Sequence, residues 1–333
     1  HTWECPCNGS QIMKLLSWLV YIPLQIVFLP LSIVGVLLVA YRQMLVSKRL
    51  GVSQTAIEVF NARWTLHVFG MRNDPGAAKL GPELPNTSIF GLRLTLFPLW
   101  VKAKVAATPE IYPRRAKQGC ENIMDLFTAR TVYFDRILAR LLPTVEQFVL
   151  MGAGMDTRPY GALNVDHVNV FELDLAATQK LKRESLQQSG INTDHVKFIA
   201  ADFASDGIFD QLDSARYDRE KKTLFLWEGV TLYLSEANVR NTLAKVHAEA
   251  VPGSVLLADI YSDRIVAQMN SRFLRKTLRY THETAQFSLK FDRAWERELF
   301  TFVESTGFTL GETFFMGTQS LHGPFVAVVE LVV

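Results

Sequence analysis

One short stretch constrains the fold more than any other. The apolar run Gln147–Met151 leads directly into Gly152-Ala153-Gly154. Glycine lets the backbone turn sharply at the end of a strand and lets a ligand approach it closely. A helix that follows such a turn presents unpaired N–H groups to a polar or negatively charged edge of the ligand. The stretch therefore predicts the first strand and the ligand-binding loop of a doubly wound α/β sheet.

The chain after Pro143 alternates short apolar runs with amphipathic stretches. Strands are predicted at Gln147–Met151, Val168–Leu173, Val196–Ala200, Thr223–Leu226 and Ser254–Ile260, with helices such as Ala176–Ser189 and Glu236–Ala250 between them. This alternation is typical of a mostly parallel sheet with helices on both faces. Phe308–Phe315 and Pro324–Val332 have no helix between them and predict a closing antiparallel hairpin. From Gly51 to about Tyr133, helical spacing broken by turns predicts a helical cap.

The loop departs from the pattern of dinucleotide-binding folds. Such a fold would have a third glycine three residues on, but this chain has Thr157 there, preceded by Asp156. An acidic residue is poorly suited to cradling phosphates and better suited to a ligand with an amino group or a sulfonium charge. The departure favours S-adenosylmethionine over NAD.

Acidic residues stand at the ends of three further predicted strands. Asp174 or Glu172 can accept hydrogen bonds from ribose hydroxyls, and Asp174, at the strand tip, is preferred. Asp202 beside Phe203 can hold an adenine amino group and cover its ring, and Glu228 would face the charged methionine end. Any one of them alone would be read as a helix cap or a solvated loop. Together they lie at the carboxyl edge, where open α/β sheets bind ligands.

The segment Leu15–Tyr41 contains no charged side chain. About 20 apolar residues suffice for a helix to cross a bilayer, so a single span is predicted, although Pro23 and Pro30 leave a re-entrant or interfacial segment open. A cleaved signal peptide and a buried core helix fit less well. The predicted division is a tail at 1–14, a membrane segment at 15–42, a helical cap at 43–133 and the ligand-binding domain at 134–333.

Charge around the membrane segment predicts its orientation. Arg42, Lys48 and Arg49 follow it and only Lys14 precedes it, which places the large C-terminal part in the cytoplasm. A second apolar patch, Ile89–Val101, is too short and interrupted to span, and fits a membrane-interface helix or a core helix equally well.

Composition excludes other classes of protein. Lys and Arg total 35 against 33 for Asp and Glu, and no basic stripe suggests a nucleic-acid partner. Three cysteines are too few for a disulfide scaffold, and Cys5 and Cys7 have no nearby ligands to complete a metal site.

Several motifs together resemble the leucine carboxyl methyltransferase family and its bacterial small-molecule relatives. They are Ala62-Arg63, Asp74–Ala78, Phe127–Asp135, Gly152–Arg158, Phe171–Asp174, Ala201–Phe203 and Trp227–Leu234, so the resemblance covers roughly residues 53 to 333. It implies a class I methyltransferase fold that binds S-adenosylmethionine. By position it implies that Arg130 holds the cofactor carboxylate, Gly152 and Gly154 form the loop, Asp174 binds the ribose, Asp202 and Phe203 bind the adenine, and Glu228 lies near the amino group. The family's N-terminal lysine has no clear counterpart, and its soluble members lack the apolar segment.

The methyl acceptor is predicted from these features. The apolar N-terminus favours a lipophilic small molecule with a carboxylate or hydroxyl group, drawn from a bilayer. An ionised carboxylate needs no base, whereas a hydroxyl would need one. The candidate catalytic residues are His322 and Tyr233, followed by His282 and His195. Tyr233, Tyr261, Arg264 and the aromatics of Ile89–Val101 would line the acceptor pocket. Carboxyl methylation of a protein C-terminus and a non-catalytic membrane-bound binding protein are the alternatives.

Overall fold

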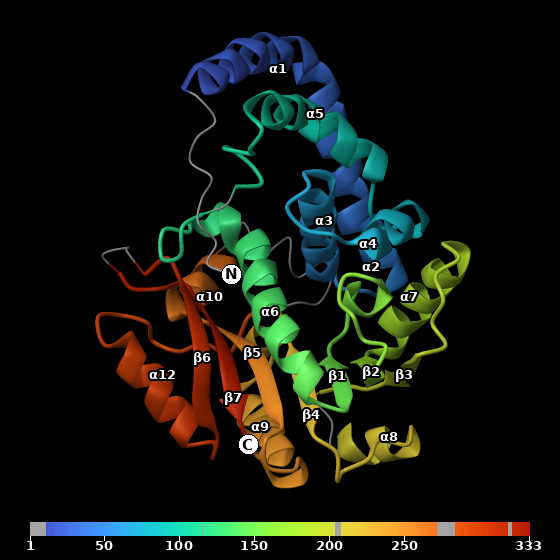
Figure 1. Ribbon diagram of the computed structural model, residues 1–333, viewed down its shortest axis with the longest axis vertical. Coiled ribbons are helices and arrows are strands. Elements are labelled where there is room, and N and C mark those ends of the chain that lie inside the picture. The colour runs from blue at the N-terminus through green and yellow to red at the C-terminus, as the bar shows by residue number, and fades with distance from the viewer. Residues whose placement is uncertain (1–10, 115, 204–207, 272–283, 319–321) are drawn as a thin grey trace.

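The computed structural model describes residues 11–114, 116–203, 208–271, 284–318 and 322–333. Its centre is a seven-stranded sheet in the order β3-β2-β1-β4-β5-β7-β6 (Figure 1). The strands are β1 (Gln147–Met151), β2 (Asn169–Asp174), β3 (Val196–Ala200), β4 (Thr223–Trp227), β5 (Val255–Tyr261), β6 (Thr309–Met316) and β7 (Val326–Val332). All seven predicted strands are present, with ends that differ by at most two residues. The predicted α/β fold class is confirmed.

Strand pairing follows the prediction as well. β1 to β5 are parallel, and β7 runs antiparallel to both β5 and β6. β7 follows β6 in the chain but lies between β5 and β6, so the hairpin inserts its second strand into the sheet. Every residue of β1, β4 and β5 is buried, because helices cover both faces at these central positions. This burial explains why the three strands are mostly apolar along their whole length rather than alternating, with Asp259 as the charged exception in β5.

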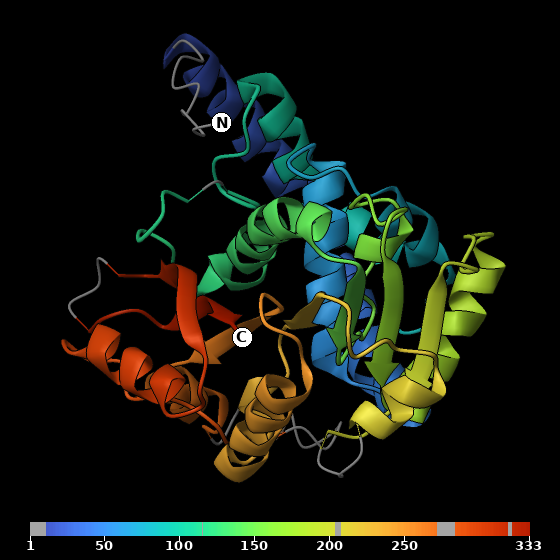
Figure 2. The same ribbon diagram turned by 60° about the horizontal axis from the view of Figure 1, so that its bottom comes forward.

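Helices pack on both faces of the sheet (Figures 1 and 2). One apolar core joins the sheet to α3 (Gln54–Val68), α4 (Pro75–Leu80), α6 (Leu126–Leu141) and α7 (Ala176–Gln188). The opposite core joins it to α8 (Ile208–Ser214), α9 (Glu236–Glu249) and α12 (Trp295–Glu304). α10 (Asp263–Met269) follows β5 directly. α6 runs through residue 133, so the predicted boundary between cap and domain falls inside a helix.

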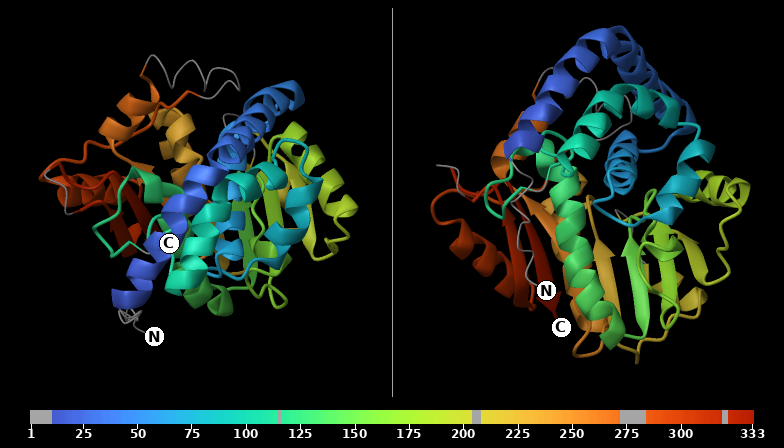
Figure 3. Two further views of the ribbon diagram at one scale, coloured as in Figure 1. Left: turned by 90° about the horizontal axis from the view of Figure 1, so that it is seen from above. Right: turned by 45° about the horizontal axis from the view of Figure 1, so that its top comes forward.

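The N-terminal helix lies beside a second helix of the cap (Figure 3). α1 (Gln11–Ala40) continues through the π-helical turn η1 (Tyr41–Val46) into α2 (Ser47–Leu50), and α5 (Ile89–Ala106) packs along it. Both helices lie above the rest of the molecule in Figure 1. Within the described residues one helix, Met13–Leu50, is long and apolar enough to cross a membrane. The patch Ile89–Val101 is helical and forms most of α5.

A buried ion pair connects β2 to α7. Lys182 Nζ lies 2.7 Å from Glu172 Oε2, both side chains are almost fully buried, and Tyr160 donates a hydrogen bond of 2.9 Å to Glu172 Oε1. Burial raises the pKa of Glu172 even though the charge of Lys182 and two hydrogen bonds oppose it.

We predict that Lys182→Met will lower the free energy of unfolding by about 3–5 kcal/mol at neutral pH, because it leaves a buried carboxylate unpaired. The loss should shrink as the pH falls, since the raised pKa of Glu172 lets the unpaired carboxyl bind a proton. Urea unfolding of both proteins at several pH values measures this. Lys180→Met on the same helix is the control, because the Lys180 side chain is 77% exposed and its pair with Glu184 contributes little. An equal effect of the two variants would contradict the prediction.

Candidate functional site

A cavity of about 790 Å³ opens at the carboxyl edge of the sheet. Its size lies within the range of small-molecule sites, about 300–1,000 Å³. Its wall includes all the residues predicted to bind a cofactor: Arg130, Gly152, Gly154, Asp156, Asp174, Asp202, Phe203 and Glu228. The structure therefore brings together residues that are up to 98 positions apart in the chain.

The loop after β1 has the backbone geometry that its glycines predict. Gly152 has φ +75°, and a Cβ there would lie 2.4 Å from Val230 Cγ2. Gly154 has φ +44°, and its N–H donates a hydrogen bond of 2.6 Å to Asp174 Oδ2. The other oxygen of Asp174 accepts a hydrogen bond of 2.7 Å from Leu175 N. The loop and the tip of β2 thus hold each other in place beside the cavity.

The two acidic candidates on β2 have different surroundings. Asp174 lines the cavity, whereas Glu172 does not and instead pairs with Lys182 beneath α7. Burial raises the pKa of Asp174, opposed by its backbone hydrogen bonds. Asp202 is exposed at the cavity wall beyond β3, and the ring of Phe203 lies 6.4 Å from that of Trp227. The predicted ribose and adenine residues therefore lie along one side of the cavity.

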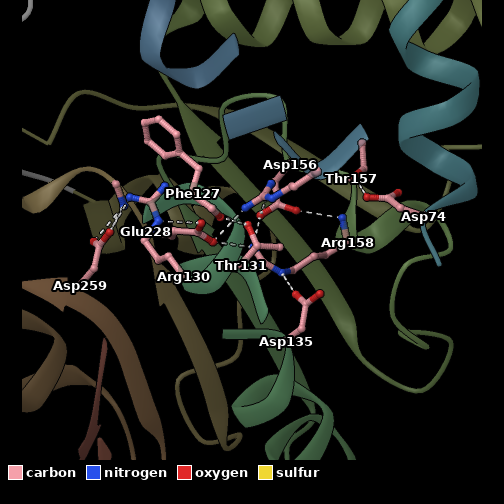
Figure 4. A network of polar contacts seen from close by, with 12 residues as sticks. Asp74, Phe127, Arg130, Thr131, Asp135, Asp156, Thr157, Arg158, Glu228 and Asp259 are labelled. Atoms are coloured by element: carbon pink, nitrogen blue, oxygen red, sulfur yellow. Dashed lines mark hydrogen bonds and ion pairs between the residues drawn. The ribbon is translucent and has the colours of Figure 1, made fainter. Parts of the chain in front are cut away.

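Glu228, at the tip of β4, is the centre of a buried charge network (Figure 4). Its Oε2 lies 2.8 Å from Arg63 Nη2 and 2.7 Å from Arg158 Nη1, and its Oε1 lies 3.2 Å from Arg130 Nε. Asp156 belongs to the same network, with Arg158 at 2.6 Å and Arg63 at 3.1 Å. The arginines come from α3, α6 and the loop after β1, so the network joins the cap to the sheet.

The arginines determine how these carboxyl groups ionise. Burial alone would raise the pKa of Glu228, but Arg158, Arg63 and Arg130 outweigh it and lower that pKa to about 2. Arg158 and Arg63 likewise overcome burial and hold the pKa of Asp156 far below its usual value. Both groups are therefore ionised at neutral pH. The charge of Asp156 is balanced within the protein by two guanidinium groups, which the sequence alone does not reveal.

Arg130 lies at the inner end of the cavity. Its Nη1 donates a hydrogen bond of 2.9 Å to Asp259 Oδ2 and another to the hydroxyl of Tyr261. Gly229, with φ +72°, passes over the guanidinium, and its N–H also binds Asp259. Asp259 and Tyr261 thus fix the orientation of Arg130 from the end of β5.

The charged residues of the cavity wall are not fully hydrogen-bonded to one another. Arg63 Nε is buried and makes no hydrogen bond within the described structure, and Glu228 Oε1 and Arg130 Nε form an ion pair of 3.2 Å without a hydrogen bond. A carboxylate and two guanidinium groups at one site match the ammonium and carboxylate groups of an amino acid. The residues present therefore fit the methionine end of S-adenosylmethionine.

Three residues of this charge network, Arg63, Arg158 and Asp259, were not predicted to act there. Arg63 is buried on α3, between Phe60 and Trp64, and a charged side chain in such an apolar stretch is a signal that it has a buried partner. Asp259 lies on β5, whose register places Ala258 beside Trp227 and so puts Asp259 next to Glu228. An acidic residue inside the predicted buried strand Ser254–Ile260 is the signal that could have found it.

The candidate catalytic residues have different positions. Tyr233 lines the cavity, and its hydroxyl bonds Thr55 Oγ1 at 3.0 Å. His322 is exposed before β7 and does not line the cavity, and His195 is bound to the carbonyl of Pro159 at 2.8 Å. His282 lies outside the described residues. The structure therefore brings Tyr233, but neither His322 nor His195, to the residues predicted to bind the cofactor.

Only some of the residues predicted to form the acceptor pocket line the cavity. Tyr261 lines the cavity with Tyr233, whereas Arg264 does not and donates hydrogen bonds to the carbonyls of Gly323 and Pro324. The aromatics of Ile89–Val101 belong to α5, and none of them lines the cavity.

Comparison with known proteins gives sequence matches to methyltransferases. The sequence profile of leucine carboxyl methyltransferase matches residues 92–247. A protein of Mycobacteroides abscessus with the provisional name S-adenosyl-L-methionine-dependent methyltransferase is 27% identical over 233 residues, which are 64% of this chain and 76% of that protein. A protein of Bacillus subtilis with a similar provisional name is 29% identical over 138 residues, 40% of this chain and 45% of that protein.

Solved structures give partial matches. A magnesium protoporphyrin IX methyltransferase of Synechocystis has a TM-score of 0.41 at 14% identity, over 66% of this chain and 90% of that one. An O-methyltransferase family protein of Burkholderia thailandensis has a TM-score of 0.37 at 15% identity, over 62% and 58%.

The sequence matches and the cavity together define a methyltransferase that uses S-adenosylmethionine. Over residues 92–247 the chain is similar to the leucine carboxyl methyltransferase family.

The charge network gives a prediction about pH. Because the folded-state pKa of Glu228 lies below its unfolded value, ionised Glu228 stabilises the fold above about pH 4.5, and this contribution is lost as the pH falls toward about 2. The contribution is on the order of a few kcal/mol. In chemical unfolding at stepwise pH, Glu228→Gln should be less stable than the parent at neutral pH. The difference should narrow in acid. A difference in unfolding free energy between the parent and Glu228→Gln that does not change with pH would contradict the lowered pKa of Glu228.

Proposed function

We propose that the protein transfers a methyl group to a carboxylate or hydroxyl oxygen of a lipophilic small molecule at a membrane. One observation carries this proposal: a single cavity joins the cofactor-binding residues to an apolar wall. That wall contains Val52, Val59, Ile123, Leu126, Phe127, Leu234, Ile265 and Met269. An apolar wall binds a lipophilic body by removing it from water.

The residues at the inner end would hold the cofactor. Arg63, Arg130 and Glu228 offer the buried donors and acceptor for its amino-acid end, and Asp174 offers a carboxylate for the ribose hydroxyls. Asp202 and Phe203 would bind the adenine. When bound there, S-adenosylmethionine supplies a methyl group on a positively charged sulfur.

The chain would then act mainly by alignment. Holding an acceptor against the methyl group replaces a bimolecular encounter with an oriented one, which can remove several kcal/mol from the barrier. None of the histidines in the described residues lines the cavity. A carboxylate acceptor, already ionised at neutral pH, matches such a site because it needs no base. For a hydroxyl acceptor, Tyr233 is the residue in position to contact the oxygen.

Membrane association is supported by the N-terminal helix. Only 11% of the residues in its 18-residue apolar window are buried, although the helix packs along α5. The helix continues through α2 into Gly51–Thr55, which form part of the cavity wall. A lipophilic acceptor in a bilayer would therefore lie close to the cavity.

The cofactor assignment can be tested by binding. We expect Asp174→Ala to weaken S-adenosylhomocysteine binding by roughly 10- to 100-fold, because each hydrogen bond to a charged group contributes about 1.5–3 kcal/mol. Isothermal calorimetry measures the affinity. Asp166→Ala, on an exposed loop, is the control. Because Asp174 also anchors the Gly154 loop, the melting temperature is measured in parallel. If Asp174→Ala binds S-adenosylhomocysteine with unchanged affinity, Asp174 does not contact the cofactor.

The acceptor class can be tested by transfer of a labelled methyl group. The full chain in lipid should label material that partitions into organic solvent, and base should release the label as methanol if the product is a carboxyl ester. A hydroxyl acceptor would give a label that resists base. Label that appears only on protein C-termini would overturn the small-molecule proposal in favour of protein carboxyl methylation.

A further inference from the structure

The helix α1 packs along α5 and has most of its large apolar side chains exposed. The side chains of α1 that are buried against its neighbours are small, namely Ser17, Ser32 and Gly35. On the outer side Leu19 is 70% exposed and Val27 is 75% exposed. A helix stable in water buries its apolar face instead. The pattern is that of helices packed together in lipid, where small residues form the contact.

The two helices run antiparallel and touch closely. Ser32 Oγ donates to the carbonyl of Leu94 at 3.5 Å, and the rings of Phe28 and Phe97 are 4.8 Å apart. A Cβ on Gly35 would lie 2.6 Å from the carbonyl oxygen of Gly91. The glycines therefore allow the backbones to approach more closely than larger residues would.

Both ends of α1 are held to the same side of the molecule. Beyond its C-terminal end, Arg42 donates a hydrogen bond of 3.0 Å to the carbonyl of Thr87, and Thr87 in turn bonds Asn61 of α3. Near its N-terminal end, Ser17 accepts a hydrogen bond of 3.1 Å from Lys102, close to the end of α5. The ammonium of Lys102 also binds Glu110.

The chain after α5 returns to the catalytic domain within a short distance. α5 ends at Ala106, and Tyr112 already packs against the core that α3 and α6 share. Six residues reach at most about 20 Å, whereas the hydrocarbon core of a bilayer is about 30 Å thick. The segment between Ala106 and Tyr112 has no regular secondary structure, and Glu110 within it forms an ion pair with Lys102. Irregular backbone of this kind does not cross lipid. A transmembrane arrangement of the pair is therefore incompatible with these contacts.

The charges around the pair favour an anionic lipid surface. No Asp or Glu occurs between Gln11 and Ile57. The exposed basic residues of the two helices and of the turns that follow α1 are Lys14, Arg42, Lys48, Arg49, Arg93 and Lys104. On α5 the exposed stripe alternates aromatic and basic side chains, Phe90, Arg93, Phe97 and Lys104, as is typical of a helix at the headgroup level.

We propose that α1 and α5 lie in the plane of one leaflet of an anionic bilayer, with both ends of α1 on the same side. The rim of the cavity at Gly51–Thr55, which follows this helix, then lies at the membrane surface. One part of this proposal rests on the proposed function. If the acceptor is lipophilic, this arrangement gives it a direct route from the leaflet into the cavity.

The arrangement can be tested by labelling single cysteines. In a background with Cys5, Cys7 and Cys120 replaced by serine, Lys14→Cys places a thiol near the N-terminal end of α1, and Arg49→Cys places one in α2, which continues from its C-terminal end. The protein is added to preformed vesicles of phosphatidylcholine and phosphatidylglycerol, followed by a membrane-impermeant maleimide. We expect both thiols to react equally, before and after the vesicles are opened. Protection of one thiol until the vesicles are opened would show a span and overturn the proposal.

A second measurement tests the lipid-facing surface. The double variant Leu19→Glu, Val27→Glu should lower partition into these vesicles at least tenfold, because charged groups are costly within the acyl region. Phe300→Glu on α12, 50% exposed, is the matched control and should not change partition. Partition should also fall when phosphatidylglycerol is omitted or salt is added.

Cofactor binding separates the two proposals. Calorimetry in detergent should give the same S-adenosylhomocysteine affinity for the parent and all the membrane variants. If the parent does not bind S-adenosylhomocysteine, the proposed function is wrong, but the membrane arrangement is unaffected. If the parent does not bind vesicles and instead self-associates in a way that the glutamate variant abolishes, a second copy of the chain covers the surface and the proposal is wrong.

Discussion

The buried carboxylate of Glu228 is the interaction on which the site depends. Three guanidinium groups, from α3, α6 and the loop after β1, meet at this one side chain at the tip of β4. Removing water from so many charges is costly, and only their mutual pairing offsets that cost. The network therefore exists only when cap and sheet are correctly docked. The same contacts that hold the cap in place leave buried polar atoms at the cavity wall, so folding and formation of the site are one event.

Much of the fold could be predicted because the relevant signals are local. β1, β4 and β5 lie in the sheet interior, and their apolar runs carry that information within five to seven residues. The backbone at Gly152 requires a positive φ that glycine adopts freely, and sheet topology then places every strand-end carboxylate at one edge. Asp174, Asp202 and Glu228 follow from this reasoning without any knowledge of their contacts.

The remaining features depend on contacts between distant residues, which no local pattern encodes. Arg63 and Glu228 are 165 positions apart, and only docking of α3 onto the sheet edge reveals that they pair. The same docking gives Asp156 two guanidinium partners. His322 was predicted as a catalytic candidate, yet between β6 and β7 it is exposed and does not line the cavity. The packing of α1 along α5 is also invisible in hydropathy, which measures how apolar a helix is and not what it touches.

The position of β7 has a consequence for the order of folding. β7 follows β6 in the chain but lies between β5 and β6, so β6 has no strand partner until β7 has been synthesised. Before that moment the sheet can contain β1 to β5 and the loop after β1, with one side of β5 open. An open strand edge is a template for pairing with another chain. The interval between synthesis of β5 and synthesis of β7 is therefore the period in which the nascent protein is most exposed to aggregation.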